Sequence, residues 1–251
     1  MAPRRRLDAE IVRRGLAPSR RDAVALVEAG RVLVGGAPAD KAARLVSPGE
    51  AVVVLGAKPR FVSRGGEKLD AALDEFGVSP LGARVLDAGA STGGFTDCVL
   101  QRGAAKVVAL DVGHGQLHER IRADPRVDVI ERYNVRRLDV DDIGGPVDLV
   151  VADVSFISLT VVLPALLGAC RPGADLVLLV KPQFEAGRAE VSRGKGVITD
   201  PEIHERVRAK IDDALRNLGA DVRGWMTSPI HGADGNKEFL VHARAPEAPR
   251  P

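Results

Sequence analysis

The sequence is poor in aromatic residues, in cysteine and in long apolar runs. Aromatic side chains make up 3% of the 251 residues, which argues against a wide platform for stacking single-stranded bases. Cys98 and Cys170 have no metal-ligand spacing around them, so we expect two reduced thiols and no metal site. No run approaches the roughly 18 apolar residues that cross a bilayer, and no apolar segment follows the basic N-terminus as in a secretory signal. These absences predict a cytoplasmic protein without a membrane partner.

The charge of the chain is unevenly divided. The formal net charge is only +2, but residues 1–60 carry twelve Lys and Arg against six Asp and Glu, whereas the remainder carries 24 against 28. A small basic region joined to a mildly acidic body predicts that the basic region meets a polyanion. Charge alone leaves RNA, DNA and an acidic membrane surface open as partners.

The N-terminal part of the chain predicts a small α+β domain. Apolar residues at helical spacing indicate two short helices, the second of them capped by Ser19. A turn at Gly35 and Gly36 then joins strand-like segments, as in a β-hairpin. We expect this domain to span residues 1–56 and a linker to span residues 57–63.

From residue 64 onward, strand-like and helix-like segments alternate. Near-continuous apolar runs that end in polar residues are typical of parallel strands buried on both faces; they cover residues 84–90, 106–112, 127–133, 148–155 and 175–182. Two later runs around a Gly-rich loop indicate an antiparallel hairpin at one end of the sheet. The pattern predicts a Rossmann-like α/β domain over residues 64–245, with a seven-stranded, mostly parallel sheet and a disordered tail over residues 246–251.

The loop after the first of these strands, DAGASTGGF, predicts a site for an adenosine cofactor. In an open α/β sheet the ligand lies beyond the carboxyl ends of the strands, and the glycines of this loop let the backbone approach it closely. The acidic Asp87 suits a ligand with a cationic amino-acid tail, such as S-adenosylmethionine, better than a pyrophosphate. Asp111, at the end of the next strand, can accept both ribose hydroxyls, although this argument fits NAD as well. The loop and the topology together favour a class I S-adenosylmethionine-dependent methyltransferase domain.

Four charged residues are expected to converge beside the cofactor. Asp153 and Lys181 end the fourth and fifth strands, which flank the cofactor cleft in this topology. Lys68 lies on the helix that enters the domain, and Glu238 begins the last strand. Taken singly, a lysine such as Lys68 is more often a solvated helix residue, and Glu238 fits a surface strand position equally well, so the hypothesis depends on the set of four.

The chemistry of a hydroxyl nucleophile accounts for such a set. A ribose 2′-hydroxyl is a poor nucleophile until its proton is removed, and the methyl donor already supplies a strong electrophile. A desolvated lysine near another cation releases its own proton more readily and can act as a general base. We expect Lys181 to be that base, Asp153 and Glu238 to orient it, and Lys68 to hold the ribose or its phosphate.

The chain contains motifs that closely resemble the TlyA family, whose members carry both hemolysin and rRNA methyltransferase names: VSRGGEKL, DAGASTGGFTD, DVGHGQL, ADVSFISL and VKPQFE. The order Lys, Asp, Lys, Glu resembles the FtsJ-like ribose 2′-O-methyltransferases, and residues 4–56 are similar to an S4 RNA-binding domain. The resemblance implies Lys68, Asp153, Lys181 and Glu238 as the catalytic quartet. It implies cytidine ribose in 23S rRNA, and in some members also in 16S rRNA, as the substrate.

The motif and the resemblance together assign a larger set of cofactor contacts. We expect the site to comprise Asp87, Gly89, Ser91, Gly93, Gly94, Phe95, Asp111, Val112, Asn134 and Asp153.

Candidate RNA contacts are basic residues in two regions. They are Arg4, Arg5, Arg6, Arg20, Arg21 and Lys41 in the N-terminal domain, and Arg188, Arg193 and Lys195 in a Gly-rich loop over residues 186–200. Contacts of this kind hold phosphates without reading sequence, so we expect selection of one cytidine to come from RNA shape and an accessible 2′-hydroxyl. A solvated basic face and a merely mobile loop are the plainer interpretations. The expected partners are rRNA or ribosomal subunits, bound by a monomer.

Three other functions stay open on the sequence. The hemolysin name predicts a membrane-active protein, although no strongly amphipathic segment supports it. An NAD-dependent oxidoreductase with an RNA-binding appendage would carry a G-x-G-x-x-G loop, which the chain lacks. An RNA-binding protein without catalysis would transfer no methyl group, whether or not Lys181 is replaced.

Overall fold

A computed structural model describes residues 4–17, 19–56, 59–232 and 234–247. The chain divides into two compact units, Met1–Arg64 and Gly65–Pro251, and each is described by itself. Residues 57 and 58 of the expected linker and residues 248–251 of the expected tail lie outside the described residues.

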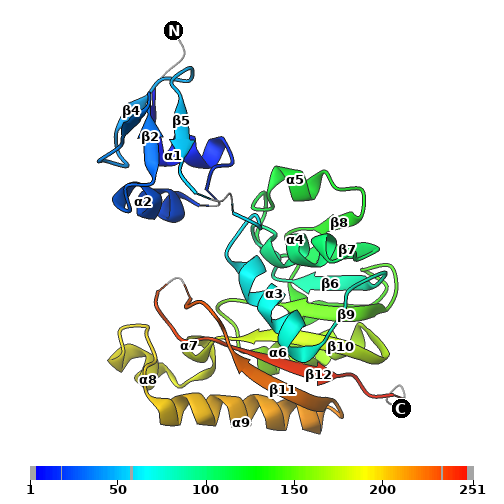
Figure 1. The fold of residues 1–251 in the computed structure, drawn as a ribbon. Coiled ribbons are helices and arrows are strands. Elements are labelled where there is room, and N and C mark those ends of the chain that lie inside the picture. Colours follow the sequence, from blue (N-terminus) through cyan, green and yellow to red (C-terminus); the bar gives the residue numbers. More distant parts are fainter. Residues whose placement is uncertain (1–3, 18, 57–58, 233, 248–251) are drawn as a thin grey trace. The chain divides into compact units, whose positions relative to one another are not determined.

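The first unit combines two helices with short antiparallel strands (Figure 1). Its elements are β1 (Arg5–Arg6), α1 (Leu7–Arg13), α2 (Arg20–Glu28), β2 (Val32–Val34), β3 (Ala37–Pro38), β4 (Leu45–Val46) and β5 (Val52–Val54). Strands β3, β2 and β5 form one sheet, and β1 pairs with β4. The predicted cap of α2 is confirmed, because Ser19 Oγ accepts a hydrogen bond from the Asp22 amide at 3.2 Å.

The predicted hairpin turn at Gly35 and Gly36 is also confirmed. Val34 pairs with Ala37 across the turn, so these two glycines are its only central residues. Their φ angles of 60° and 85° are both positive, as the tight turn that matches strand twist requires. A side chain at either position would meet backbone strain, which is the reason for two successive glycines here.

The second unit is built on one seven-stranded sheet (Figure 1). Its strands are β6 (Arg84–Ala88), β7 (Lys106–Leu110), β8 (Val127–Ile130), β9 (Val147–Ala152), β10 (Cys170–Val180), β11 (Asp221–Thr227) and β12 (Phe239–Arg244). Their order is β11-β12-β10-β9-β6-β7-β8. The pairs among β6 to β10 are parallel, whereas β12 runs antiparallel to both β10 and β11. The predicted Rossmann-like fold with a terminal antiparallel hairpin is therefore confirmed.

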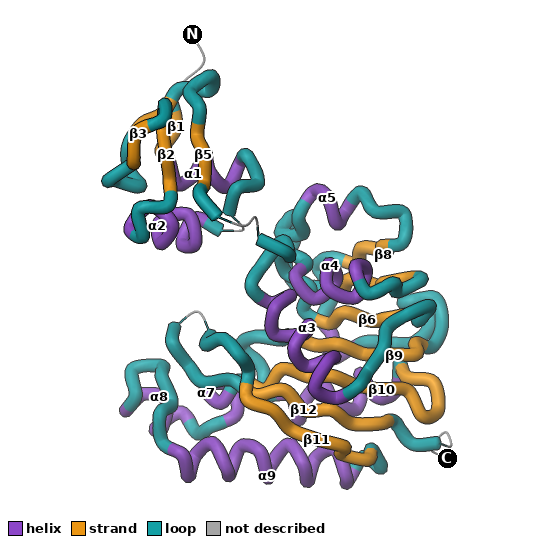
Figure 2. Tube along the Cα trace, viewed as in Figure 1, coloured by secondary structure: helices purple, strands orange, loops and turns teal. Residues whose placement is uncertain are grey.

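Helices cover both faces of this sheet (Figure 2). They are α3 (Gly65–Phe76), α4 (Gly94–Gln101), α5 (Glu119–Arg122), α6 (Leu159–Gly168), α7 (Pro182–Glu185), α8 (Arg188–Arg193) and α9 (Pro201–Asn217), with a short 3₁₀ helix at Val135–Arg137. Helices α6 and α9 pack in one core with Leu86, Val150 and Leu178 of the sheet. Helices α3 and α4 pack together on the other face, where Phe76 stacks on His242 of β12. In the described part of the chain, every helix is too short or too polar to span a bilayer.

The segment 186–200 differs from the expected loop because it contains α8. The Glu190 carboxylate accepts a hydrogen bond from the Gly187 amide at 2.9 Å, which caps the first turn of that helix. The Gly-rich composition of the segment concealed this turn, since glycine lowers helix propensity.

Candidate active site

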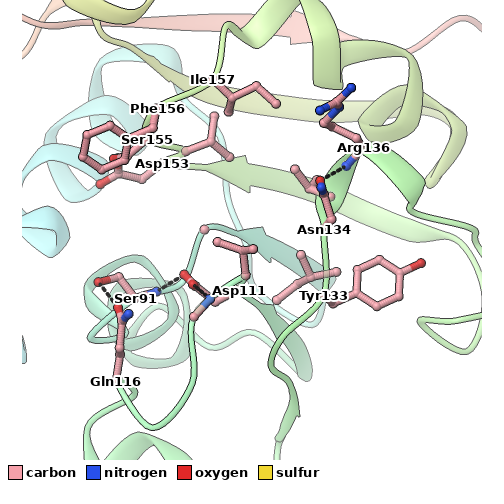
Figure 3. Close-up of a pocket in the computed structure, with 16 residues that line it drawn as sticks. Ser91, Asp111, Gln116, Tyr133, Asn134, Arg136, Asp153, Ser155, Phe156 and Ile157 are labelled. Atoms are coloured by element: carbon pink, nitrogen blue, oxygen red, sulfur yellow. Dashed lines mark hydrogen bonds between the residues drawn. The ribbon is translucent and has the colours of Figure 1, made fainter.

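A cavity of about 490 Å³ lies beyond the carboxyl ends of the central strands (Figure 3). Its walls come from the loops that follow β6, β7, β8 and β9. Six of the expected cofactor residues line it: Gly89, Ser91, Asp111, Val112, Asn134 and Asp153. This is the position at which open α/β sheets bind their ligands.

Asp111 braces two of the loops around the cavity (Figure 3). Its carboxylate accepts hydrogen bonds from the Ser91 amide at 2.8 Å and from the Gly113 amide at 2.6 Å. Ser91 in turn donates from its hydroxyl to Gln116 at 3.3 Å. Because the carboxylate is fixed by backbone donors on both oxygens, it stands ready for hydroxyl groups of a ligand without further ordering.

Asp87 lies beneath the cavity and does not line it. The side chain is fully buried, Thr96 Oγ1 donates to Asp87 Oδ2 at 2.6 Å, and Asp87 Oδ1 has no hydrogen-bond partner among the described residues. Burial, reinforced by the charges of Asp153 and Asp111, raises the pKa of Asp87 to about 7, although the hydrogen bond from Thr96 opposes this. The carboxylates of Asp111 and Asp153 in the cavity wall favour a ligand that brings positive charge.

The glycines of the first loop serve the packing of protein segments. A Cβ on Gly89, whose φ is +88°, would lie 2.6 Å from the backbone oxygen of Asp153, and one on Gly93 would lie 2.8 Å from Leu117. Gly93 is the N-cap of α4, and Gly94 and Phe95 are buried in its first turn. A close approach of the ligand is the expected reason for these glycines, whereas the atoms that a Cβ on Gly89 or Gly93 would meet belong to neighbouring segments of the protein.

The four charged residues of the predicted quartet form two ion pairs. Lys181 Nζ contacts the Asp153 carboxylate and donates a hydrogen bond to Ser155 Oγ at 2.8 Å. Lys68 Nζ contacts the Glu238 carboxylate, although 170 positions separate the two residues. Both lysine side chains are nearly buried, at 11% and 10% exposed. Neither ammonium is therefore an ordinary solvated surface charge.

Strand pairing brings the two ion pairs to one edge of the sheet. Val180 of β10 lies opposite Phe239 of β12, so the next residues, Lys181 and Glu238, follow at the open end of that pair of strands. Asp153 directly follows β9, which is the other neighbour of β10. Adjacent strands are about 4.8 Å apart, so the side chains of these three strand ends can reach a common ligand.

Phe156 is a feature of the site that the sequence did not predict. It lines the cavity, its side chain is 91% exposed, and its φ of +63° is in the left-handed region, where a bulky residue is strained. Its ring lies 5.1 Å from the ring of Phe184 (centroid to centroid). The signal available in the sequence was an aromatic residue close to Asp153 in a chain that has few aromatics.

The predicted RNA-contact residues differ in how free they are. Arg6 and Arg20 both bind the buried carboxylate of Asp8, at 3.0 and 2.9 Å. The exposed side chains of Arg4, Arg5, Arg21 and Lys41 form no ion pair with any described residue. In the second unit, Arg188 begins α8, and Arg193 and Lys195 are exposed at its end. The structure therefore leaves part of the basic set available for an outside anion.

Comparison with known families agrees with this architecture. Residues 61–245 match the FtsJ-like methyltransferase family, and residues 5–52 match the S4 domain. A structure described as a candidate S-adenosylmethionine-dependent methyltransferase from Listeria monocytogenes shares the fold of the second unit, with a TM-score of 0.53 at 16% identity over 73% of this chain and 99% of that one.

Relatives that match nearly the whole chain narrow the assignment. The 16S/23S rRNA (cytidine-2′-O)-methyltransferase TlyA of Mycobacterium tuberculosis is 51% identical over 97% of this chain and 91% of its own length. Hemolysin A of Brachyspira hyodysenteriae is 40% identical over 94% and 98%. A structure described as a candidate hemolysin from Streptococcus thermophilus has a TM-score of 0.80 at 41% identity over 99% and 91%. The chain belongs to the TlyA family, in which an S4 domain precedes an FtsJ-like methyltransferase domain.

Proposed function

We propose that the protein methylates the ribose 2′-hydroxyl of a cytidine in ribosomal RNA, with Lys181 as general base. The observation that carries the proposal is that two lysine–carboxylate pairs contribute Lys181, Asp153 and Glu238 from adjoining strand ends, next to a cavity lined by Asp111 and Asp153. The name of the Mycobacterium tuberculosis relative gives 16S and 23S rRNA as targets, and that of a Campylobacter jejuni relative, 34% identical, gives 23S rRNA. The proposed substrate is accordingly 23S rRNA, with 16S rRNA as a second target.

The residues around the cavity fit S-adenosylmethionine. Asp111 would hold the ribose hydroxyls, and Val112 and Asn134 would flank the adenine. The carboxylate of Asp153 would supply negative charge for the amino and sulfonium groups, and buried Asp87, which does not line the cavity, would add negative charge when it is ionised. When bound, the cofactor supplies a methyl group activated by a sulfonium.

Lys181 is the residue proposed to take the proton of the 2′-hydroxyl, as a neutral amine whose ammonium has first released one proton to solvent. Its contacts with Asp153 and Ser155 fix the position of Nζ and stabilise the ammonium that proton transfer produces. Glu238 keeps Lys68 in place from the neighbouring strand end, where Lys68 can hold the ribose or its phosphate. The remaining contribution to the rate is positioning of the hydroxyl for in-line displacement.

The S4 domain is proposed to bind the RNA by its phosphates. Those of its cations that form no ion pair with a described residue are exposed, as electrostatic attachment to a polyanion requires. Arg193 and Lys195 in the second unit are proposed to add contacts near the reacting nucleotide.

The experiment that tests the function is mass-spectrometric mapping of methylated nucleotides. Ribosomal subunits from cells without the gene would be incubated with the purified protein and S-adenosylmethionine, and rRNA from cells with and without the gene would be compared. We expect 2′-O-methylcytidine at one or more positions that depend on the gene. The absence of any gene-dependent ribose methylation would overturn the proposal.

A further inference from the structure

Two segments of the methyltransferase domain lie side by side next to the cavity. One follows β9, from Asp153 to Ser158, and the other follows β10, from Lys181 to Glu185. Three contacts, spaced along the two segments, hold one segment against the other. Lys181 contacts Asp153 and Ser155 at the first end, Phe156 packs on Phe184 in the middle, and Ser158 bonds Glu185 at the last end.

The last of these contacts involves a carboxylate that is almost completely buried. The Glu185 side chain is 2% exposed. One of its oxygens accepts from the Leu159 amide at 2.6 Å, and the other accepts from Ser158 Oγ at 2.5 Å and from Lys210 Nζ at 3.0 Å. Both oxygens are therefore satisfied, as a buried charge requires.

Glu185 also secures the start of α6. Ser158 is the N-cap of this helix, and Leu159 is its first residue. A carboxylate that receives the first helical amide satisfies a donor with no partner inside the helix and interacts favourably with the helix dipole. Glu185 thus fixes the end of the loop that begins at Asp153. Glu185 itself belongs to the other segment, the one that carries Lys181.

The strained residue of that loop lies between two anchors. Phe156 has a φ of +63° and an almost fully exposed ring, so its own packing holds it weakly. The bond from Lys181 to Ser155 precedes it, and the bond from Ser158 to Glu185 follows it. A strained backbone persists only where its surroundings hold it on both sides.

We propose that Glu185 is a positioning residue for methyl transfer. It clamps the loop after β9 to the segment after β10, and so keeps Lys181, Asp153 and Phe156 in their working arrangement. The inference rests on the proposed methyltransferase function. It assigns Glu185 a role in the rate of the chemical step, beyond that of a helix cap.

The clamp is tested by kinetics on the full chain with Glu185→Ala and Glu185→Gln. For Glu185→Ala we expect kcat to fall by up to about 100-fold, because the base and the loop lose their relative position, while KM for S-adenosylmethionine changes by less than about threefold. Glu185→Gln keeps one oxygen that can accept from the Leu159 amide, so it should recover part of kcat. Ser158→Ala removes one bond of the clamp from the other side, and should lower kcat less than Glu185→Ala.

Glu205→Gln is the matched control. Glu205 is an exposed acid on α9 that pairs with Arg208 at 3.2 Å and touches neither segment, so kcat should stay at the wild-type value. A wild-type kcat per folded molecule in Glu185→Ala, with only a lower melting temperature, would overturn the clamp. If Glu185→Ala does not fold, an unchanged kcat in both Ser158→Ala and Glu185→Gln would overturn it equally.

Hydrogen–deuterium exchange supplies a readout that needs no activity. Amides of residues 155–160 should exchange roughly tenfold faster in Glu185→Ala than in the wild type, with a smaller increase in Glu185→Gln and with β6 and β7 unchanged. Unchanged exchange in that segment contradicts the clamp. A wild-type protein that transfers no methyl group to RNA contradicts the proposed function instead, and the exchange result then still decides whether Glu185 holds the loop.

Discussion

At the scale of single residues, the site places two buried lysines in different settings. Lys181 contacts Asp153 and Ser155, whereas Lys68 contacts Glu238. A base must be able to release and regain its proton next to the reacting hydroxyl, and only Lys181 lies directly beside a cavity-lining carboxylate. This difference is the reason for assigning proton transfer to Lys181 and substrate holding to Lys68.

Replacement of Lys181 tests that assignment. We expect Lys181→Ala to lower kcat by about 10²- to 10⁴-fold, the usual contribution of a positioned base. The affinity for S-adenosylmethionine, measured by calorimetry, should change little because Lys181 does not line the cavity. Lys106→Ala is the control, since Lys106 lies at the amino end of β7, away from the carboxyl ends that face the cavity, and pairs with Asp128 at 2.7 Å. Methyl transfer at the wild-type rate by Lys181→Ala would exclude it as the base.

The buried carboxyl of Asp87 predicts a pH dependence of cofactor binding. Its pKa is raised from 3.8 to about 7, so in the folded protein it stays partly protonated at neutral pH. The stability associated with that proton is present at low pH and is lost as pH rises through about 7, whereas a cationic ligand binds better to the ionised form. Affinity for S-adenosylmethionine should therefore rise by up to about tenfold between about pH 6 and about pH 8.

Calorimetry in buffers of different ionisation enthalpy would measure the proton released on binding. Asp87→Asn removes the titrating group at nearly constant volume and should flatten this part of the dependence. An identical pH dependence in the variant and the wild type would show that another group is responsible.

At the scale of elements, α1 is held by buried carboxylates. Asp8 bonds Arg6 and Arg20, and Glu10 bonds Arg13 and Arg14. These hydrogen bonds, chiefly those from Arg6 to Asp8 and from Arg13 to Glu10, lower the pKa of both carboxyls to about 2. Because Arg6 and Arg20 form ion pairs with Asp8 inside the domain, only part of the basic cluster seen in the sequence is available to an outside anion.

This arrangement predicts acid lability of the S4 domain. The carboxyl pKa values are lower in the folded domain than the ordinary 3.8 and 4.5, so the unfolded chain binds protons more readily. The stabilisation is complete above about pH 4.5 and is lost as pH falls towards about 2. Amide NMR signals of residues 5–52 in the full chain should lose dispersion over this range. Glu10→Gln should lower the stability of the S4 domain at neutral pH and should make that stability depend less on pH between about 4.5 and about 2. An acid unfolding transition identical to that of the wild type would contradict the role of Glu10.

At the scale of the whole molecule, RNA capture and chemistry are expected to separate in kinetics. Arg5, Arg21 and Lys41 are exposed and form no ion pair with described residues, so they are the best candidates for phosphate contacts in the S4 domain. Replacing all three by alanine should raise KM for RNA and leave kcat at saturating RNA unchanged. The slope of log affinity against log salt should decrease by about 2 to 3, close to one unit for each lost phosphate contact.

The matched control for this triple variant is Arg216→Ala. Arg216 lies on α9 and pairs with Asp212, so it should alter neither KM nor the salt slope. An unchanged salt slope in the triple variant would show that these three residues do not contact RNA phosphates.

Much of this organisation was predictable because it follows local rules. The buried parallel strands were visible as apolar runs, and Ser19, Gly35 and Gly36 marked a helix start and a tight turn. Helix α8 was missed because its glycine-rich flanks concealed a capped turn, and β1 and β4 were missed because strands of two residues carry no periodic pattern. Phe156 was missed because exposure and backbone strain are not encoded in a short local motif.

The amino-acid sequence by itself determined the sheet and the identity of the residues at its strand ends, because hydrophobic periodicity and polar strand termini act over a few neighbouring positions. Only the tertiary structure decided which charge meets which. Lys68 finds Glu238 across 170 positions, Arg6 and Arg20 turn inward to Asp8, and Glu185 bonds a loop that follows another strand. Ion pairs and hydrogen bonds depend on distances of a few ångströms between remote segments, and those distances exist only once the strands have paired.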